Sequence, residues 1–99
     1  MTEPADLPGV HTALLDAETL AALFRDLSLA ARVLDVRVKG QQSRYASTEA
    51  WSLDAARTAL AEGHLSGVQV RYVLGAQIWR DTLMSTPEGT RLVRIQEPG

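Results

Sequence analysis

The chain has 99 residues, of which 45% are hydrophobic and 22% are charged, and it contains no cysteine. This length and composition are typical of one globular domain, and the lack of cysteine excludes disulfides, thiolate metal sites and cysteine nucleophiles. Ten basic and twelve acidic side chains give a net charge of −2, which argues against nucleic acid as the main partner.

The first eleven residues include Pro4, Pro8 and Gly9 and are predicted to form a flexible N-terminal arm. They show no basic region followed by an apolar stretch, so we expect no signal peptide. No apolar run approaches the roughly 18 to 20 residues of a membrane span, so we expect no membrane partner. Together with the absence of cysteine, these features favour the cytoplasm. We expect one domain over residues 12–96 and a frayed tail over residues 97–99.

The spacing of apolar residues predicts a first helix over Ala17–Ser28. Asp16 is suited to cap its first amides, whereas Thr12 is an alternative cap that would start the helix one turn earlier. The residues that recur at helical spacing and form one stripe are Leu20, Leu23, Phe24 and Leu27.

Strict alternation of apolar and polar residues predicts a strand over Val33–Lys39 with one solvated side. Gly40 ends this strand, and Arg44–Ala46 is a candidate for a short returning strand. The apolar side consists of Leu34, Val36 and Val38. The solvated side consists of Asp35, Arg37 and Lys39.

A second helix is predicted between Ser52, a good N-cap, and Gly63, which suits the C′ position. Trp51 precedes the cap and is placed to pack on the first turn as a hydrophobic staple. The buried stripe of this helix is expected to consist of Leu53, Ala56 and Leu60.

The last third of the chain predicts a three-stranded meander over Val68–Leu74, Gln77–Met84 and Thr90–Gln96. Gly75–Ala76 suits a two-residue type II′ turn, and Thr86–Gly89 suits a type I turn. The resulting order, α-β-(β)-α-β-β-β, lacks regular βαβ alternation. It therefore predicts an α+β fold with two layers, in which two helices pack on a mainly antiparallel sheet of four or five strands.

The two-residue loop sets the register of the first hairpin, so that Leu74 lies opposite Gln77 and Arg71 lies opposite Arg80. The face predicted to be apolar carries Val68, Val70, Tyr72, Leu74, Trp79 and Leu83.

The register of the second hairpin adds Leu92 opposite Leu83 on the same face, and Arg94 opposite Asp81. A lone buried aspartate costs several kcal/mol. We therefore expect Asp81 and Arg94 to form a structural ion pair.

The opposite face of the meander holds more apolar side chains than a solvated face requires. Its apolar members are Val73, Ile78, Met84, Val93 and Ile95. Its polar members are Gln69, Arg71, Arg80, Thr82 and Arg91.

Three interpretations of this face follow from the residues. The first helix covers it while the arginines extend to the edge, or a second copy or another protein covers it, or Arg71 and Arg80 hold an anion between them.

The sequence contains no arrangement typical of catalysis or of metal binding, so we expect neither an enzyme nor a cofactor. His11 and His64 are the two histidines, and they lie far apart along the chain. Tyr72 and Trp79 fall on the predicted core face, whereas Tyr45 and Trp51 remain candidates for a contact surface.

The segment from about residue 51 to 96 resembles small hypothetical proteins of high-GC proteobacteria. The resemblance lies in Gly67-Val-Gln-Val-Arg-Tyr, in Ile78-Trp-Arg-Asp-Thr-Leu and in Arg91-Leu-Val-Arg-Ile. It implies a helix that ends in glycine, followed by two strands, and it implies no activity.

No motif of a known activity is present, so the function is not readable from the sequence. The best interpretation is a non-enzymatic protein-interaction or accessory domain, with a protein partner or self-association. The alternative is a domain that binds a small anion or a nucleic-acid phosphate through Arg71, Arg80 and Arg91. The predicted interaction residues are Tyr45, Trp51, Arg71, Val73, Ile78, Arg80, Arg91 and Val93.

Overall fold

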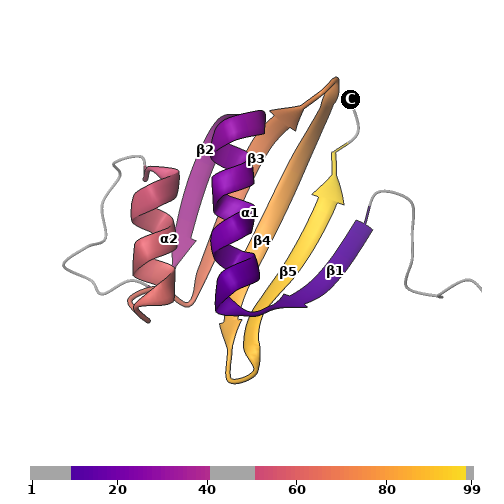
Figure 1. Ribbon diagram of the computed structural model, residues 1–99. Coiled ribbons are helices and arrows are strands. Elements are labelled where there is room, and N and C mark those ends of the chain that lie inside the picture. The colour runs from indigo at the N-terminus through magenta and orange to yellow at the C-terminus, as the bar shows by residue number, and fades with distance from the viewer. Residues whose placement is uncertain (1–9, 41–50, 98–99) are drawn as a thin grey trace, which may run out of the picture.

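A computed structural model describes residues 10–40 and 51–97 (Figure 1). Its elements are β1 (Val10–Leu15), α1 (Ala17–Ala30), β2 (Arg32–Lys39), α2 (Leu53–Ala61), β3 (Gly67–Leu74), β4 (Gln77–Thr86) and β5 (Gly89–Gln96). The predicted returning strand at Arg44–Ala46 lies outside the described residues, as do residues 1–9 of the predicted arm and residues 98–99 of the predicted tail.

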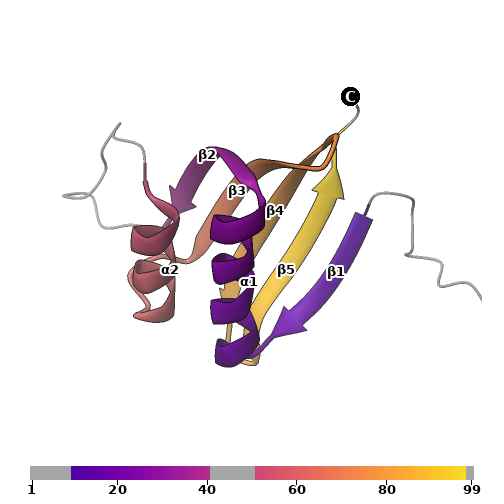
Figure 2. The same cartoon turned by 45° about the horizontal axis from the view of Figure 1, so that its top comes forward.

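The five strands form one antiparallel sheet in the order β1-β5-β4-β3-β2. Both described helices lie on the same face of this sheet, which gives a two-layer structure (Figures 1 and 2). The predicted α+β class is therefore confirmed, with five strands and the element order β-α-β-α-β-β-β.

Strand β1 was not predicted, because Val10 and His11 were expected in the arm and Thr12 was considered as a helix cap. These residues instead pair with the last strand, from Val10 opposite Ile95 to Leu15 opposite Thr90. Leu15 is the one buried residue of β1, so the strand does not need the alternation of apolar and polar residues that indicates a half-buried strand. Its structure depends on a partner from the other end of the chain.

Asp16 settles where α1 begins. Its backbone is extended and its side chain accepts a 2.8 Å hydrogen bond from the backbone N–H of Thr19. That hydrogen bond lowers the pKa of the Asp16 carboxyl. The predicted stripe packs inward, with Leu20, Phe24 and Leu27 buried.

Helix α2 begins and ends as expected. The Ser52 hydroxyl accepts a hydrogen bond from the N–H of Ala55, and Gly63 follows the C-cap with a φ of +80°. Ala56 and Leu60 are buried in the predicted stripe, and Leu53 packs against the core.

Strand β2 departs from the predicted alternation at a β-bulge. Val33 lies opposite Tyr72 and Asp35 lies opposite Arg71, which leaves Leu34 as the extra residue. As a result Val33 packs against the core, while Leu34 is 40% exposed. The predicted position of Leu34 on the apolar side is therefore wrong, because a bulge shifts the faces of the residues before it.

The meander has the predicted register throughout both hairpins. Gly75 has a φ of +63°, whereas Ala76, the second residue of the turn, does not have a positive φ. A type II′ turn requires a positive φ at its first central residue alone. Leu74 was predicted on the core face but is 44% exposed, because it is the last strand residue before this turn.

The core face contains a buried polar network around Asp81, which is 0% exposed. Arg94 donates two 2.8 Å hydrogen bonds to its two carboxylate oxygens, and the Tyr72 hydroxyl donates a third at 3.0 Å. Burial raises the pKa of Tyr72, and the hydrogen bond to Asp81 raises the pKa of Arg94. The predicted Asp81–Arg94 ion pair is confirmed.

Candidate interaction surface

The sheet face opposite the helices is the candidate surface, and we call it the open face. The buried residues of β3, β4 and β5 point toward α1 and α2, so the alternate residues of these strands point away from them. The expectation that the first helix covers this face is wrong, because the apolar stripe of α1 packs with Val68, Tyr72 and Leu83 on the other side.

The apolar side chains of the open face extend from its centre to the β1 edge. Leu14 is 56% exposed and Met84 is 38% exposed, and the others are partly buried. The apolar members of the face are Val10, Leu14, Val73, Ile78, Met84, Val93 and Ile95.

Positive charge is concentrated on this face. Its register positions carry two carboxylates, Asp35 and Glu97, although the whole chain has a net charge of −2. The cations are Arg32, Arg37, Lys39, Arg71, Arg80 and Arg91. The open face therefore has a positive surplus, and the rest of the molecule is correspondingly acidic.

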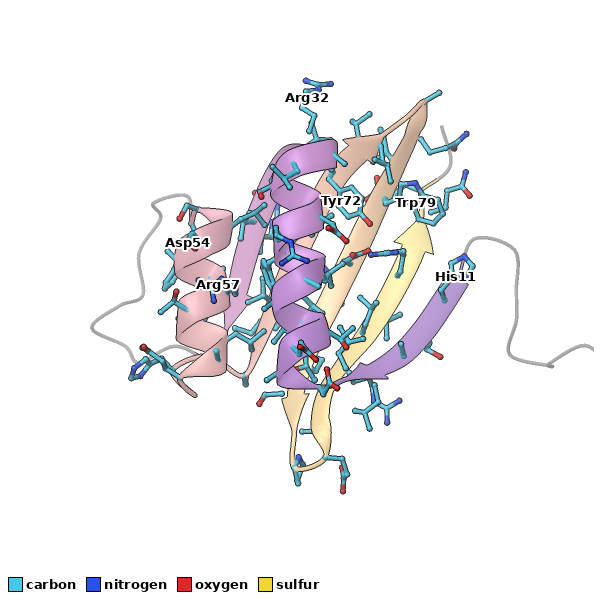
Figure 3. All side chains as sticks on the ribbon, viewed as in Figure 1. His11, Arg32, Asp54, Arg57, Tyr72 and Trp79 are labelled. Carbon is cyan, nitrogen blue, oxygen red and sulfur yellow. The ribbon has the colours of Figure 1, made fainter. Side chains whose placement is uncertain are left out.

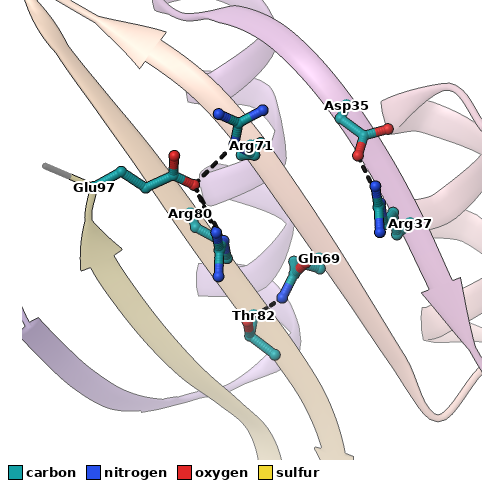
Figure 4. Close-up of polar contacts among 7 residues, drawn as sticks. All are labelled: Asp35, Arg37, Gln69, Arg71, Arg80, Thr82 and Glu97. Atoms are coloured by element: carbon teal, nitrogen blue, oxygen red, sulfur yellow. Dashed lines mark hydrogen bonds and ion pairs between the residues drawn. The ribbon is translucent and has the colours of Figure 1, made fainter. Parts of the chain in front are cut away.

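Two of these arginines share an internal counter-ion (Figure 4). Arg71 and Arg80 lie directly opposite each other, and one carboxylate oxygen of Glu97 is 2.8 Å from Arg71 Nε and 3.0 Å from Arg80 Nη2. The hydrogen bond from Arg71 lowers the pKa of Glu97, and the same bond raises the pKa of Arg71.

Glu97 was predicted to belong to the frayed tail, and this is wrong. Its backbone N–H donates a 2.8 Å hydrogen bond to the carbonyl of Ile78, and its side chain is only 13% exposed. The alternation of Arg91, Val93 and Ile95 continues to Glu97, and this pattern could have indicated its place on the face.

The open face has one further ion pair and one hydrogen bond between neutral side chains among the described residues. Arg37 pairs with Asp35 at 2.8 Å, and the Gln69 amide donates a 3.2 Å hydrogen bond to the Thr82 hydroxyl (Figure 4). Within residues 10–40 and 51–97, neither Lys39 nor Arg91 has a carboxylate partner.

A hollow of about 330 Å³ lies on the open face at the point where β3 begins. Gly67 has no side chain between its register partners Lys39 and Met84, and the Met84 sulfur lies 3.2 Å from the place that a Cβ on Gly67 would take. Arg91 lies beside Met84 on β5, so Lys39 and Arg91 are on either side of the hollow. The lining residues are Arg37, Val38, Lys39, Gly67, Val68, Gln69, Thr82 and Met84.

The structure brings together most of the predicted interaction residues. Val73, Ile78 and Val93 lie on the open face together with the three predicted arginines. Arg91 lies beside Met84, at the other end of the face from Arg71 and Arg80, so the three arginines do not converge on one anion.

Tyr45 and Trp51, which were predicted as contact residues, are not among the described residues of the open face. Trp51 is partly buried and packs against the core, whereas Tyr45 lies outside the described residues. Sequence reasoning did not select Val10, Leu14 or Lys39, because the open face extends over β1 and β2 only once the sheet is assembled.

Neither histidine forms a reactive group with the other side chains that the structure describes. His11, which lies in β1 and not in an arm, packs its ring 6.2 Å from that of Trp79 (Figure 3). His64 lies 3.4 Å from Glu62, and both are mostly exposed. Within the described ranges, no three His, Asp or Glu side chains are grouped to hold a metal ion.

Neither described helix is long and apolar enough to cross a membrane. Comparisons with protein-family models, with curated proteins and with solved structures found no match.

Proposed function

We propose that this protein is a non-enzymatic protein-interaction domain of the cytoplasm that binds an acidic and apolar segment of another protein on its open face. The observation that carries this proposal is the composition of the open face, where exposed apolar side chains lie beside a surplus of positive charge. Such mixed apolar and polar patches are typical of protein contact surfaces.

The hollow at Gly67 indicates which kind of partner segment the open face would bind. A hollow of this size accommodates an apolar side chain of a partner. Lys39 and Arg91, which have no carboxylate partner among the described residues, could pair with carboxylates on either side of it. A segment in which an apolar residue is flanked by acidic residues would satisfy both features at once.

Charge also bears on which partner is favoured. Two open faces in contact would bring two positive surfaces together, so face-to-face pairing of two copies is opposed electrostatically. An acidic segment of a different protein meets no such repulsion.

The alternative of a small-anion site has less support. Arg71 and Arg80 are the closest pair of cations on the face, but Glu97 already occupies the position between them. An external phosphate there would have to displace a carboxylate that belongs to the chain.

Site-specific photo-crosslinking tests the proposal. A photoreactive benzoylphenylalanine at Val93, which lies between Thr12 and Thr82 on the open face, is expected to crosslink a partner segment rich in Asp, Glu and apolar residues. The matched control carries the same group at Leu29, which is 79% exposed on α1. In the Val93 probe, adding Lys39→Glu or Arg91→Glu should reduce the crosslink, as should added salt.

The proposal is overturned if the same partner crosslinks equally from Leu29, or if the captured segment is basic. It is also overturned if the only protein captured at Val93 is a second copy of the chain that is crosslinked outside β1, since such a product requires face-to-face pairing.

A further inference from the structure

Within the part of the chain that the structure describes, strand β1 is an edge of the sheet that lacks the usual protection against pairing with another strand. Natural edge strands carry charged residues, proline or bulges, or they are covered. Val10–Leu15 contains no charged residue and no proline, and its register with β5 is unbroken. The other edge, β2, is protected by a bulge and by the charged residues Arg32, Asp35, Arg37 and Lys39.

The hydrogen bonds of the sheet show which residues of β1 direct their backbone N–H and C=O groups away from β5. In an antiparallel pair, residues alternate between those bonded to the partner strand and those facing away. The N–H of Glu97 donates to Ile78, so the odd-numbered residues of β5 bond to β4 and the even-numbered ones bond to β1.

The even-numbered residues of β5 pair with His11, Ala13 and Leu15. It follows that the N–H and C=O groups of the alternate residues Val10, Thr12 and Leu14 point out of the sheet.

We propose that β1 pairs antiparallel with β1 of a second copy of this chain, about a two-fold axis that passes beside Thr12. In this register Thr12 lies opposite Thr12 of the second copy, and Val10 lies opposite Leu14 of the second copy. Every outward N–H and C=O group of Val10, Thr12 and Leu14 then has a partner. A shift by two residues would leave part of them unpaired.

The side chains support a second copy of the same strand as the occupant. The residues that bond outward are Val10, Thr12 and Leu14, so a threonine lies between two apolar residues. An antiparallel copy of the strand presents the same order, because the pattern reads the same in both directions. The axis therefore brings together two threonines, which form a favourable cross-strand pair. Each valine meets a leucine, so apolar side chains lie against each other. The strand contains no Asp, Glu, Lys or Arg, so no fixed charges repel two copies of it.

The described helices leave this edge accessible. His11 and Ala13, on the helix side of β1, are exposed, and β1 lies to one side of α1 in both views (Figures 1 and 2). Pairing at this edge would join two five-stranded sheets into one of ten strands. The two open faces would then form one continuous apolar area around Val10, Val93 and Ile95 of both copies. The cations would lie toward the two outer ends of the ten-stranded sheet.

The first measurement is solution mass by light scattering over a range of concentrations. The wild type is expected to be a dimer at high concentration. Thr12→Pro is expected to weaken association by roughly tenfold or more, because proline removes the two hydrogen bonds on the axis. The N–H of Thr12 donates nothing within the sheet, so the variant should fold. The matched control Thr12→Val keeps the N–H and should dimerise like the wild type.

The second measurement tests the register. The chain has no cysteine, so a single introduced thiol reports on one position. Thr12→Cys should form a disulfide-linked dimer on mild oxidation, since directly opposed residues have Cα atoms about 5.5 Å apart. Leu14→Cys should not, because the two copies of this residue would be four residues, or roughly 14 Å, apart along the strands at about 3.4 Å per residue.

A wild type that is monomeric at every concentration overturns the proposal. So does a dimer that crosslinks as readily through Leu14→Cys as through Thr12→Cys. If Thr12→Pro fails to fold, Leu14→Lys replaces it, since this side chain is already 56% exposed. A dimer unaffected by that change contradicts the proposed edge. These outcomes are independent of whether the open face binds an acidic segment.

Discussion

Arg71 on β3 and Arg80 on β4 lie directly opposite each other, and the carboxylate of Glu97 bridges their guanidinium groups. Two like charges at this position destabilise an antiparallel pair unless a counter-charge is near. The backbone hydrogen bond from Glu97 to Ile78 holds that counter-charge at the end of β5. The end of the last strand thereby stabilises the neighbouring hairpin.

We expect Glu97→Gln to lower the urea midpoint of unfolding, because the two arginines then face each other without a negative charge. Glu88→Gln is the matched control, since Glu88 is an exposed turn residue. The double variant Glu97→Gln with Arg80→Gln should recover part of the loss. Equal effects of Glu97→Gln and Glu88→Gln would show that solvent screens the arginine pair.

The stabilisation from Glu97 should depend on pH in a defined direction. Its pKa in the folded protein is lowered from the ordinary value of 4.5 by the hydrogen bond from Arg71. The contribution is therefore fully present above pH 4.5 and is lost as the pH falls through the lowered value. In urea unfolding series, the wild type and Glu97→Gln should differ near neutral pH and converge in acid. A difference that persists unchanged in acid would contradict this account.

Removing Arg94 should be costly, because Asp81 would remain buried without its counter-charge. Arg94→Leu is expected to lower the free energy of unfolding by about 3–5 kcal/mol, and Tyr72→Phe by about 1.5–3 kcal/mol. The double variant Asp81→Leu with Arg94→Met should be more stable than Arg94→Leu alone. Chemical unfolding of the three variants checks this order, and a cost for Arg94→Leu below that of Tyr72→Phe would refute it.

The bulge in β2 predicts unequal effects at two adjacent apolar residues. Val33→Ala removes a side chain that packs against the core and should cost about 1–2 kcal/mol. Leu34→Ala changes a side chain that is 40% exposed and should cost no more than about 0.5 kcal/mol. Thermal or urea unfolding of the pair measures the difference, and the reverse order would mean that the strand alternates without a bulge.

Gly89 should tolerate no side chain. Its φ is +146°, and an added Cβ would lie 2.7 Å from the carbonyl oxygen of Leu15, so Gly89→Ala should cost about 1–3 kcal/mol. Gly75 has a φ of +63° with no atom within 4 Å of an added Cβ, so Gly75→Asn is a milder control. Similar losses for both variants would argue against a close contact between Gly89 and β1.

Local features of the sequence predicted most of the elements correctly. Asp16 and Ser52 cap helices, and the Gly75 turn has the backbone that a hairpin with this register needs. These signals act over a few residues, so they operate before any tertiary contact forms. The register in turn placed Asp81 opposite Arg94, which the structure shows as a buried pair.

By itself, then, the sequence determined the two helices, the meander with its register, and the α+β class. Only the tertiary structure decided that β1 exists, that Leu34 is an extra residue, that α1 leaves the open face uncovered and that Glu97 lies between Arg71 and Arg80. Each of these depends on segments far apart in the chain, such as Val10 beside Ile95. Capping and alternation are local, whereas the choice of which face is covered and which edge is paired is made by the whole sheet.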